Sequence, residues 1–272
     1  MTPMKTTLPS TTTHRVVSRA EWLIVRQELL QKEKELTRRR DELAEQRRTL
    51  PWVVVDKQYV FDTPNGERTL ADLFAGRSQL VVKHFMLAPG QGEGCVGCSF
   101  EADHADAALV HLNNHDVSYV AVARAPLAEI AAFQRRMGWR FPWVSSHGSD
   151  FNFDFNVSFT KAQIASGRVF YNYREDPIPV EELSGHSVFC RDADGSIFHT
   201  YSAFGRGAEE LIGTYMFLDM TPKGRNESGR GNLTDWVRHH DRYDAVGHVD
   251  GTGRWIAGQP SAGSCCAREG GS

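Results

Sequence analysis

Two cysteines lie three positions apart in the stretch GEGCVGCSF, and this spacing could support redox chemistry. Cys95 follows a glycine-rich loop, and Cys98 comes about one helical turn later. If a helix starts here, its first backbone N–H groups and the positive end of its dipole face the Cys95 sulfur and favour the thiolate. Cys95 is therefore predicted to be a solvent-open nucleophile, and Cys98 a shielded thiol that resolves a mixed disulfide.

The Cys-x-x-Cys pattern leaves two other interpretations open. It is half of a four-ligand zinc site, which would make the protein a module that holds a soft metal ion. Cys265 and Cys266 suit the second half poorly because no residue separates them. The pair could also be small core residues, the role predicted for Cys190. The remaining metal ligands could come from histidines brought together in space, namely His84, His104, His147, His186 and His199.

Other residues carry weaker chemical signals. The residue types of a Ser-His-Asp hydrolase triad occur close together at Ser145, Ser146, His147 and Asp150. Four neighbours on one loop cannot easily adopt the geometry of a triad, so a local turn is predicted there. Glu93 could act as a general base, although a solvated loop acid is the simpler interpretation. For His84 and His199, both within apolar strand sequence, hydrogen-bonded core positions are expected.

The elements around the motif must bring it to one end of a sheet. Apolar runs of strand length alternate with helical segments, which predicts an α/β fold with a mixed central sheet. A strand, a loop and a helix around the cysteines favour the redox interpretation. The expected elements are buried strands at 80–86 and 117–123, helices at 99–114 and 126–137, a half-exposed strand at 151–157, and a hairpin of strands at 186–190 and 196–202.

Composition divides the 272-residue chain into four parts. Residues 1–17 are a mobile, Thr-rich lead-in, and residues 18–50 are one long helix. Residues 51–246 form the main domain with helices at its C-terminal end. Residues 247–272 are rich in Gly, Ser and Ala and are predicted to be disordered.

The long helix has a capping box and a narrow apolar stripe. Ser18 is its predicted N-cap, and Glu21 completes the capping box. An apolar residue recurs every seven positions, while the other seam positions are mostly polar. The helix is expected to pack on its own domain or to pair with a second copy in a homodimer. The stripe consists of Trp22, Leu29, Leu36, Leu43 and Leu50.

Charge and hydropathy exclude several classes of partner. The formal net charge of -3 gives no basic bias for capture of nucleic acid or of an anionic membrane. No apolar stretch approaches the length of a membrane span or of a secretory signal. A cytoplasmic protein is therefore expected. In that reducing compartment, a Cys-x-x-Cys pair indicates redox or metal chemistry rather than a structural disulfide.

Several segments resemble a bacterial family of predicted thioredoxin-like proteins, catalogued as domain of unknown function 899. They are HFM, GCVGCSF, RMGWRFPWVSSHGSDFN, FHTYS and LDMTPKGR, and the resemblance covers about residues 15–243. It implies a thioredoxin-like fold and a dithiol-disulfide oxidoreductase activity with Cys95 and Cys98 as the catalytic pair. The implied partner is a disulfide-bearing protein or a small thiol, without a cofactor. Unlike thioredoxin, the chain has Val96-Gly97 between the cysteines and no proline before the candidate strand at Gly185-His186.

Overall fold

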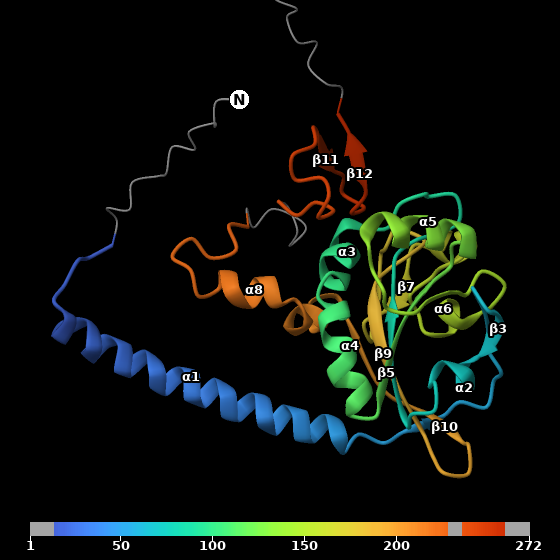
Figure 1. Ribbon diagram of the computed structural model, residues 1–272, viewed down its shortest axis with the longest axis horizontal. Helices are drawn as coiled ribbons and strands as arrows, with labels where there is room; N and C mark the ends of the chain where they lie inside the picture. The colour runs from blue at the N-terminus through green and yellow to red at the C-terminus, as the bar shows by residue number, and fades with distance from the viewer. Residues whose placement is uncertain (1–13, 228–235, 259–272) are drawn as a thin grey trace, which may run out of the picture. The chain divides into compact units, whose positions relative to one another are not determined.

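A computed structural model describes residues 14–227 and 236–258 of the chain (Figure 1). The chain divides into two compact units, residues 1–50 and residues 51–272. The described part of the first unit is helix α1 (Arg19–Arg48) and its flanks. None of the helices within the described ranges combines the length and the hydropathy that crossing a bilayer requires.

Helix α1 forms where the sequence predicts it. Ser18 Oγ accepts a hydrogen bond from the Glu21 N–H at 3.3 Å, and the Glu21 carboxylate accepts one from the Ser18 N–H at 3.0 Å. This is the predicted capping box. The helix buries none of its residues. Its apolar stripe is about half exposed, so the partner of the stripe stays a prediction; these side chains are Trp22, Leu29, Leu36 and Leu43.

Within the described part of the second unit, eight strands form one mixed sheet in the order β1-β10-β9-β4-β5-β6-β2-β3. Two further hairpins, β7–β8 and β11–β12, lie outside it. The strands are β1 (Val53–Val54), β2 (Val60–Thr63), β3 (Gly66–Thr69), β4 (Gln79–His84), β5 (Val117–Ala123), β6 (Trp143–Ser145), β7 (Val169–Tyr171), β8 (Arg174–Asp176), β9 (Gly185–Arg191), β10 (Ile197–Phe204), β11 (Gly247–Val249) and β12 (Trp255–Ala257).

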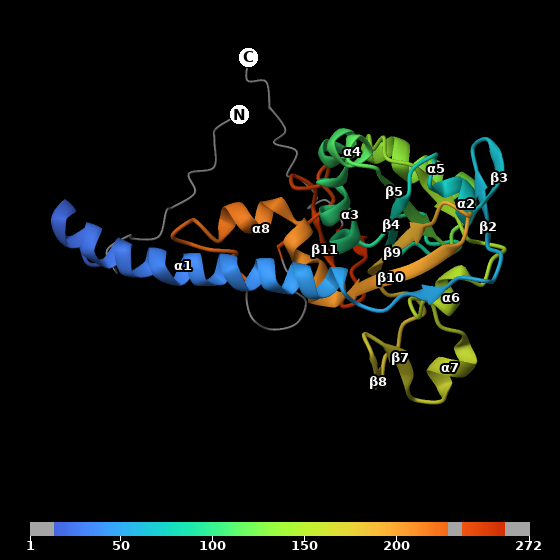
Figure 2. The ribbon, with the colours of Figure 1, turned by 90° about the horizontal axis from the view of Figure 1, so that it is seen from below.

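Helices cover both faces of this sheet (Figure 1, Figure 2). Helices α3, α4 and α5 enclose one apolar cluster with the sheet, and α2 and α6 enclose another on the opposite face. The helical segments of this unit are α2 (Leu70–Leu73), α3 (Val96–Ala102), α4 (Ala105–Asn114), α5 (Leu127–Met137), α6 (Phe151–Asp154), α7 (Lys161–Ala165), the 3-10 helix η1 (Gly205–Leu211) and α8 (Gly213–Leu218).

The strand connections give the fold class. Strands β4 and β5 are parallel and are joined through α3 and α4, while β9 runs antiparallel beside β4. Strand β10 then pairs antiparallel with β9 and leads into η1 and α8. A β-α-β unit followed by two antiparallel strands and a helix, in the order β5-β4-β9-β10, is the thioredoxin-like arrangement. The predicted fold class is confirmed.

The central strand β4 carries a buried charged residue that matters for the site. Leu80 and Val82 point into the cluster beneath α2 and α6. Side chains alternate along a strand, so Lys83 and Phe85 face α3 and α5 instead. Phe85 joins the apolar cluster there. Lys83 is fully buried on the same face.

The helix predicted over 99–114 is two helices, because the chain breaks between α3 and α4. The break falls at Asp103 and His104. The His104 ring hydrogen-bonds the Phe100 carbonyl at 2.9 Å, and the Asp103 carboxylate accepts from Trp139 Nε1 at 2.7 Å. A side chain that binds a carbonyl of the last turn, as His104 does, competes with continuation of the helix.

The strand predicted over 151–157 is wrong, because α6 occupies this segment. Its alternating phenylalanines also satisfy a helical period: Phe151 and Phe155 are four residues apart and both pack against Phe189. Asn156 then ends the turn with a positive φ of 56°. Burial of two rings on one side of a single turn therefore outweighs the alternation.

The disordered tail predicted from residue 247 also differs from the structure. Strands β11 and β12 form a hairpin over residues 247–257, and residues 259–272 lie outside the described part. Gly251 and Gly253 sit in its turn, where the Asp250 carboxylate accepts hydrogen bonds from the N–H groups of Thr252 and Arg254. A composition typical of disorder is here the composition of a tight turn.

Candidate active site

The loop between β4 and α3 delivers Cys95 to the end of the sheet. The Cys95 N–H donates to the Met86 carbonyl at 3.0 Å, which ties the loop back to the strand. Gly94 has no room for a side chain, because a Cβ there would meet the rings of Phe85 and Phe133. Close packing of this loop therefore fixes where α3 begins.

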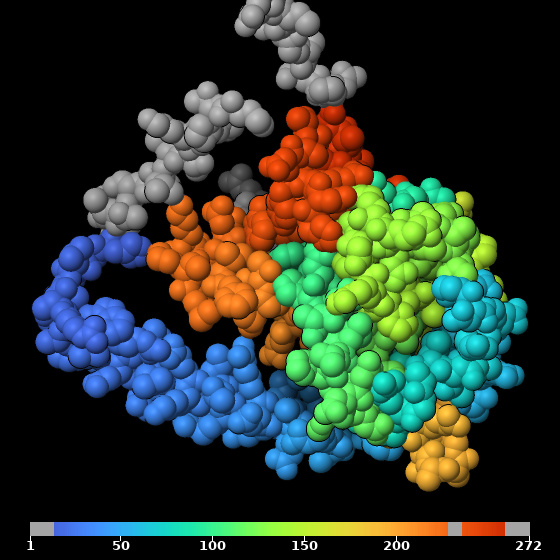
Figure 3. Space-filling view, in the orientation of Figure 1, coloured from blue at the N-terminus to red at the C-terminus, as the bar shows by residue number. Residues whose placement is uncertain are grey.

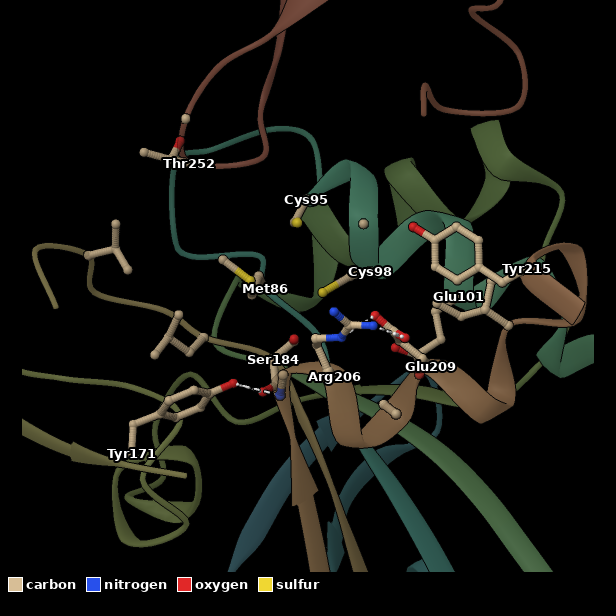
Figure 4. Close-up of a pocket in the computed structure, with 17 residues that line it drawn as sticks. Met86, Cys95, Cys98, Glu101, Tyr171, Ser184, Arg206, Glu209, Tyr215 and Thr252 are labelled. Carbon is tan, nitrogen blue, oxygen red and sulfur yellow. Dashed lines mark hydrogen bonds and ion pairs between the residues drawn. The ribbon is translucent and has the colours of Figure 1, made fainter. Parts of the chain in front are cut away.

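Both cysteines lie at the start of α3, as predicted. Cys95 is the N-cap residue, and Cys98 lies in the first turn with its side chain in the apolar cluster beneath the helix. Both are free thiols. Figure 4 shows the two sulfurs on the side of α3 that faces a cavity, with Thr252 above them and Tyr171 below.

The two thiols differ in acidity. The pKa of Cys95 is lowered to about 7, first by the Cys98 thiol, then by the backbone N–H groups of Cys98 and Gly97 and by the Lys83 charge, although burial opposes the shift. The pKa of Cys98 is raised well above its ordinary value because it faces Cys95 and is buried. At neutral pH, Cys95 is therefore partly a thiolate and Cys98 is a neutral thiol.

A buried ion pair lies on the sheet side of α3. Lys83 Nζ is 2.5 Å from Glu101 Oε2, and His186 Nε2 is 2.7 Å from Glu101 Oε1. Burial alone would raise the pKa of Glu101, but the positive charge of Lys83 lowers it to about 2. Burial lowers the pKa of His186, so this ring is neutral at pH 7. A charged Lys83–Glu101 pair thus stands beside the thiols.

Sequence reasoning missed this pair. Lys83 interrupts the apolar run LVVKHFM, and a lysine inside a buried strand needs a counter-charge. That was the available signal. Glu101 could not be named as the partner from the sequence, because only the packing of α3 on β4 brings the two together.

The expectation that Cys95 is open to solvent is wrong. Its exposed fraction is 9%, compared with 3% for Cys98. The turn of the hairpin β11–β12 covers it, and the Val96 N–H donates to the Gly253 carbonyl at 2.8 Å. Figure 3 shows this hairpin as red atoms packed against the rest of the second unit. Cys98 is shielded, as predicted.

Two cavities meet at Cys95. One of about 410 Å³ also contains Cys98 and Glu101 on its wall. The other, of about 310 Å³, extends towards Pro89 and Glu182. A buried sulfur bordered by cavities of this size is within reach of a small molecule.

The serine, histidine and aspartate residues at 145–150 do not form a catalytic triad. Ser145 Oγ donates to the Ala125 carbonyl at 2.7 Å, and the His147 ring hydrogen-bonds the Arg124 carbonyl at 3.1 Å. Asp150 instead forms an ion pair with Lys57 at 2.9 Å. The predicted local turn is present, because the His147 N–H donates to Ser145 Oγ at 3.1 Å. The other contacts tie this segment to distant parts of the chain.

Glu93 is neither a free base nor a solvated acid. Its carboxylate lies 2.8 Å from Arg136 Nη1 and also pairs with Arg242. Two guanidinium groups therefore bind the oxygen atoms of this carboxylate. Glu93 therefore fastens the loop before Cys95 to α5 and to the segment after residue 236.

The two histidines predicted within strands are confirmed as hydrogen-bonded strand residues. His84 Nε2 lies 2.8 Å from Ser187 Oγ, and His199 Nε2 lies 2.7 Å from Ser202 Oγ. Among the described residues, no three His, Cys, Asp or Glu side chains form a group that could hold a metal ion. Cys265 and Cys266 lie outside the described residues.

Comparison with known families identifies the family of this chain. A family model described as "Bacterial protein of unknown function (DUF899)" matches residues 11–243. The chain belongs to this family. The match in this DUF899 protein includes Cys95 and Cys98 and ends before the hairpin β11–β12. No curated protein matches the chain.

Solved structures similar to this DUF899 protein include peroxiredoxins. Peroxidoxin BcpB from Mycobacterium tuberculosis is 16% identical with a TM-score of 0.38, over 61% of this chain and 95% of that chain. Peroxiredoxin Q from Xanthomonas campestris is 14% identical with a TM-score of 0.39, over 57% and 87%. The mitochondrial 2-Cys peroxiredoxin from Plasmodium falciparum is 14% identical with a TM-score of 0.36, over 64% and 96%.

Proposed function

We propose that this protein is a thiol-disulfide oxidoreductase. The observation that carries the proposal is the pair of free thiols at the start of α3, one with its pKa lowered to about 7 and the other with its pKa raised. A nucleophile is most effective when its pKa lies near the ambient pH. Cys95 meets that condition, and Cys98 stays protonated until it is needed.

The reaction proceeds in two exchanges that balance in atoms and electrons. The Cys95 thiolate attacks one sulfur of a disulfide, forms a mixed disulfide, and releases the other sulfur as a thiolate that takes up a proton. Cys98 then loses its proton to solvent and attacks the Cys95 sulfur, which releases the second thiol. The substrate is reduced by two electrons, and Cys95–Cys98 becomes a disulfide that an external dithiol must reduce.

The position of the ion pair supports the second step. Cys98 must become a thiolate inside an apolar cluster, where its charge is costly. The Lys83 charge lowers the pKa of Cys98 against the effects of Cys95 and of burial. When Cys95 is consumed in the mixed disulfide, its negative charge no longer opposes ionisation of Cys98. Release of the first product therefore promotes the attack that completes the cycle.

Trapping the intermediate tests the proposal. The Cys98→Ser variant should accumulate a mixed disulfide on Cys95, because the second attack is removed, whereas Cys95→Ser should form none. Peptide mass spectrometry locates the adduct, and Cys190→Ser serves as the matched control that behaves like the parent. The rate of adduct formation should rise with pH through about 7, following the Cys95 thiolate. An adduct formed equally well without Cys95 would contradict the proposal.

The cell compartment follows from the same chemistry. We propose that the protein works in the cytoplasm, where low-molecular-weight dithiols and thiol proteins keep such a pair reduced between cycles. Fractionation of cells followed by immunodetection tests this placement. Recovery of the protein in an extracytoplasmic fraction would contradict it.

A further inference from the structure

The covered nucleophile limits which disulfides can reach it. We infer that the hairpin turn at residues 250–254 restricts the reaction to low-molecular-weight disulfides with largely apolar halves and excludes protein disulfides. This inference rests on the proposed oxidoreductase function. It names the substrate class for the same site.

The turn is in direct contact with the reactive residue. The Gly253 carbonyl accepts a hydrogen bond from the Val96 N–H at 2.8 Å, so it occupies the first donor of α3. A Cβ placed on Gly253 would come within 2.8 Å of Cys95 Sγ. Only glycine fits at this approach, and its φ of 81° also favours glycine. No substrate atom can enter between the turn and the sulfur from this side.

Contacts on its far side hold the turn in this position. The Trp255 ring packs against the apolar cluster of Val96, Phe100 and Val237. The guanidinium groups of Arg238 and Arg242 lie 5.5 and 5.6 Å from the centre of the same ring. Cation-π contacts of this kind contribute about 0.5–1 kcal/mol each at exposed sites. Trp255 therefore anchors the turn to the helix that carries the cysteines.

Two cavities still reach Cys95, and the larger of them has a volume of about 410 Å³. Its volume falls within the range of small-molecule sites. Its exposed wall is more apolar than polar, and the apolar part includes Met86, Val180, Leu183, Ile212 and Tyr215. A neutral disulfide with apolar or aromatic halves matches this lining.

A protein disulfide does not fit the same opening. In a protein, the two Cα atoms of a disulfide lie about 5.5–6 Å apart, so two main chains accompany the sulfur atoms wherever they go. At Cys95 these chains would have to occupy the space of Thr252 and Gly253 on one side or of Val180 and Leu183 on the other. A small disulfide brings no chain beyond its two halves.

Single-turnover kinetics tests the inference on the full-length, pre-reduced protein. The probes are 2,2′-dithiodipyridine as a small aromatic disulfide and insulin as a protein disulfide. Each rate is divided by the rate of the same probe with dithiothreitol, which removes the difference in intrinsic reactivity. The parent protein should favour the small disulfide by at least about tenfold, the scale on which pockets discriminate by shape.

Variants of the hairpin provide the contrast. Trp255→Ala removes the anchor, and Gly253→Ala forces the turn away from the sulfur, so both should lose most of the preference by gaining reactivity with insulin. His248→Ala changes an exposed residue of the same hairpin and should keep it. The inference is overturned if the parent reduces both probes equally or if both turn variants retain the parental preference. If the parent protein reacts with neither probe, as is expected of Cys95→Ser, the proposed function itself is rejected.

Discussion

Lys83 is a fully buried lysine beside two thiols, and Glu101 supplies its counter-charge at 2.5 Å. A buried charge without a partner is costly, whereas the paired ions have a modest net effect on stability. The pair therefore sets the electrostatic environment of the cysteines more than it stabilises the fold. The positive charge of Lys83 lies beside the cysteines, where a thiolate must form. This is the residue-scale basis of the proposed chemistry.

Replacing Glu101 by Gln tests this arrangement. The substitution leaves Lys83 buried without a counter-charge and should lower the free energy of unfolding by about 3–5 kcal/mol. Urea denaturation at pH 7 measures the change. The control is Asp176→Asn, which removes the exposed partner of Arg174 and should cost less than about 1 kcal/mol. Equal losses in the two variants would contradict the assignment.

The same carboxylate predicts a pH dependence. The pKa of Glu101 is about 2 in the fold and has an ordinary value of 4.5, so the folded state binds its proton more weakly than the unfolded chain. Its stabilising contribution is complete above about pH 4.5 and is lost as the pH falls towards 2. The parent should therefore lose more stability than Glu101→Gln over this window, and parallel losses would contradict it.

At the scale of elements, the start of α3 depends on one close-packed glycine. Gly94→Ala would place a methyl group against the rings of Phe85 and Phe133 and should destabilise the fold by about 1–3 kcal/mol. Denaturation measures this loss, and alkylation of Cys95 reports the displaced loop. Gly148→Ala is the matched control, because its Cβ would meet open space, and it should change stability by less than about 0.5 kcal/mol. A neutral Gly94→Ala would contradict the packing argument.

The sequence predicts most elements but fails where two periods fit one segment. Strand β5 and helix α5 form as expected, because each shows a single period over its length. The segment Phe151–Asp154 satisfies both the alternation of a strand and the turn of a helix, and packing against Phe189 decides. The hairpin β11–β12 was hidden for a related reason, since the glycines of a tight turn resemble those of a disordered tail.

At the scale of the whole molecule, α1 and the thioredoxin-like domain are separate units. Because α1 buries none of its residues, removing residues 1–50 should shift the melting temperature of the remaining chain by less than about 2 °C. Calorimetry measures this shift, and a larger drop would contradict it.

Sedimentation of the full-length protein and of the protein without residues 1–50 tests the predicted homodimer through α1. This homodimer is rejected if the two proteins have the same number of subunits.

The sequence by itself determined the α/β core, the capping box of α1, and the placement of Cys95 and Cys98 at the start of a helix. Each follows from neighbouring residues, whose periodicity and capping pattern express local geometry. Only the tertiary structure decided that Gly253 covers Cys95 and that Glu101 pairs with Lys83. Those contacts join residues far apart in the chain, and their partners are chosen by packing and charge compensation, which no short stretch of sequence records.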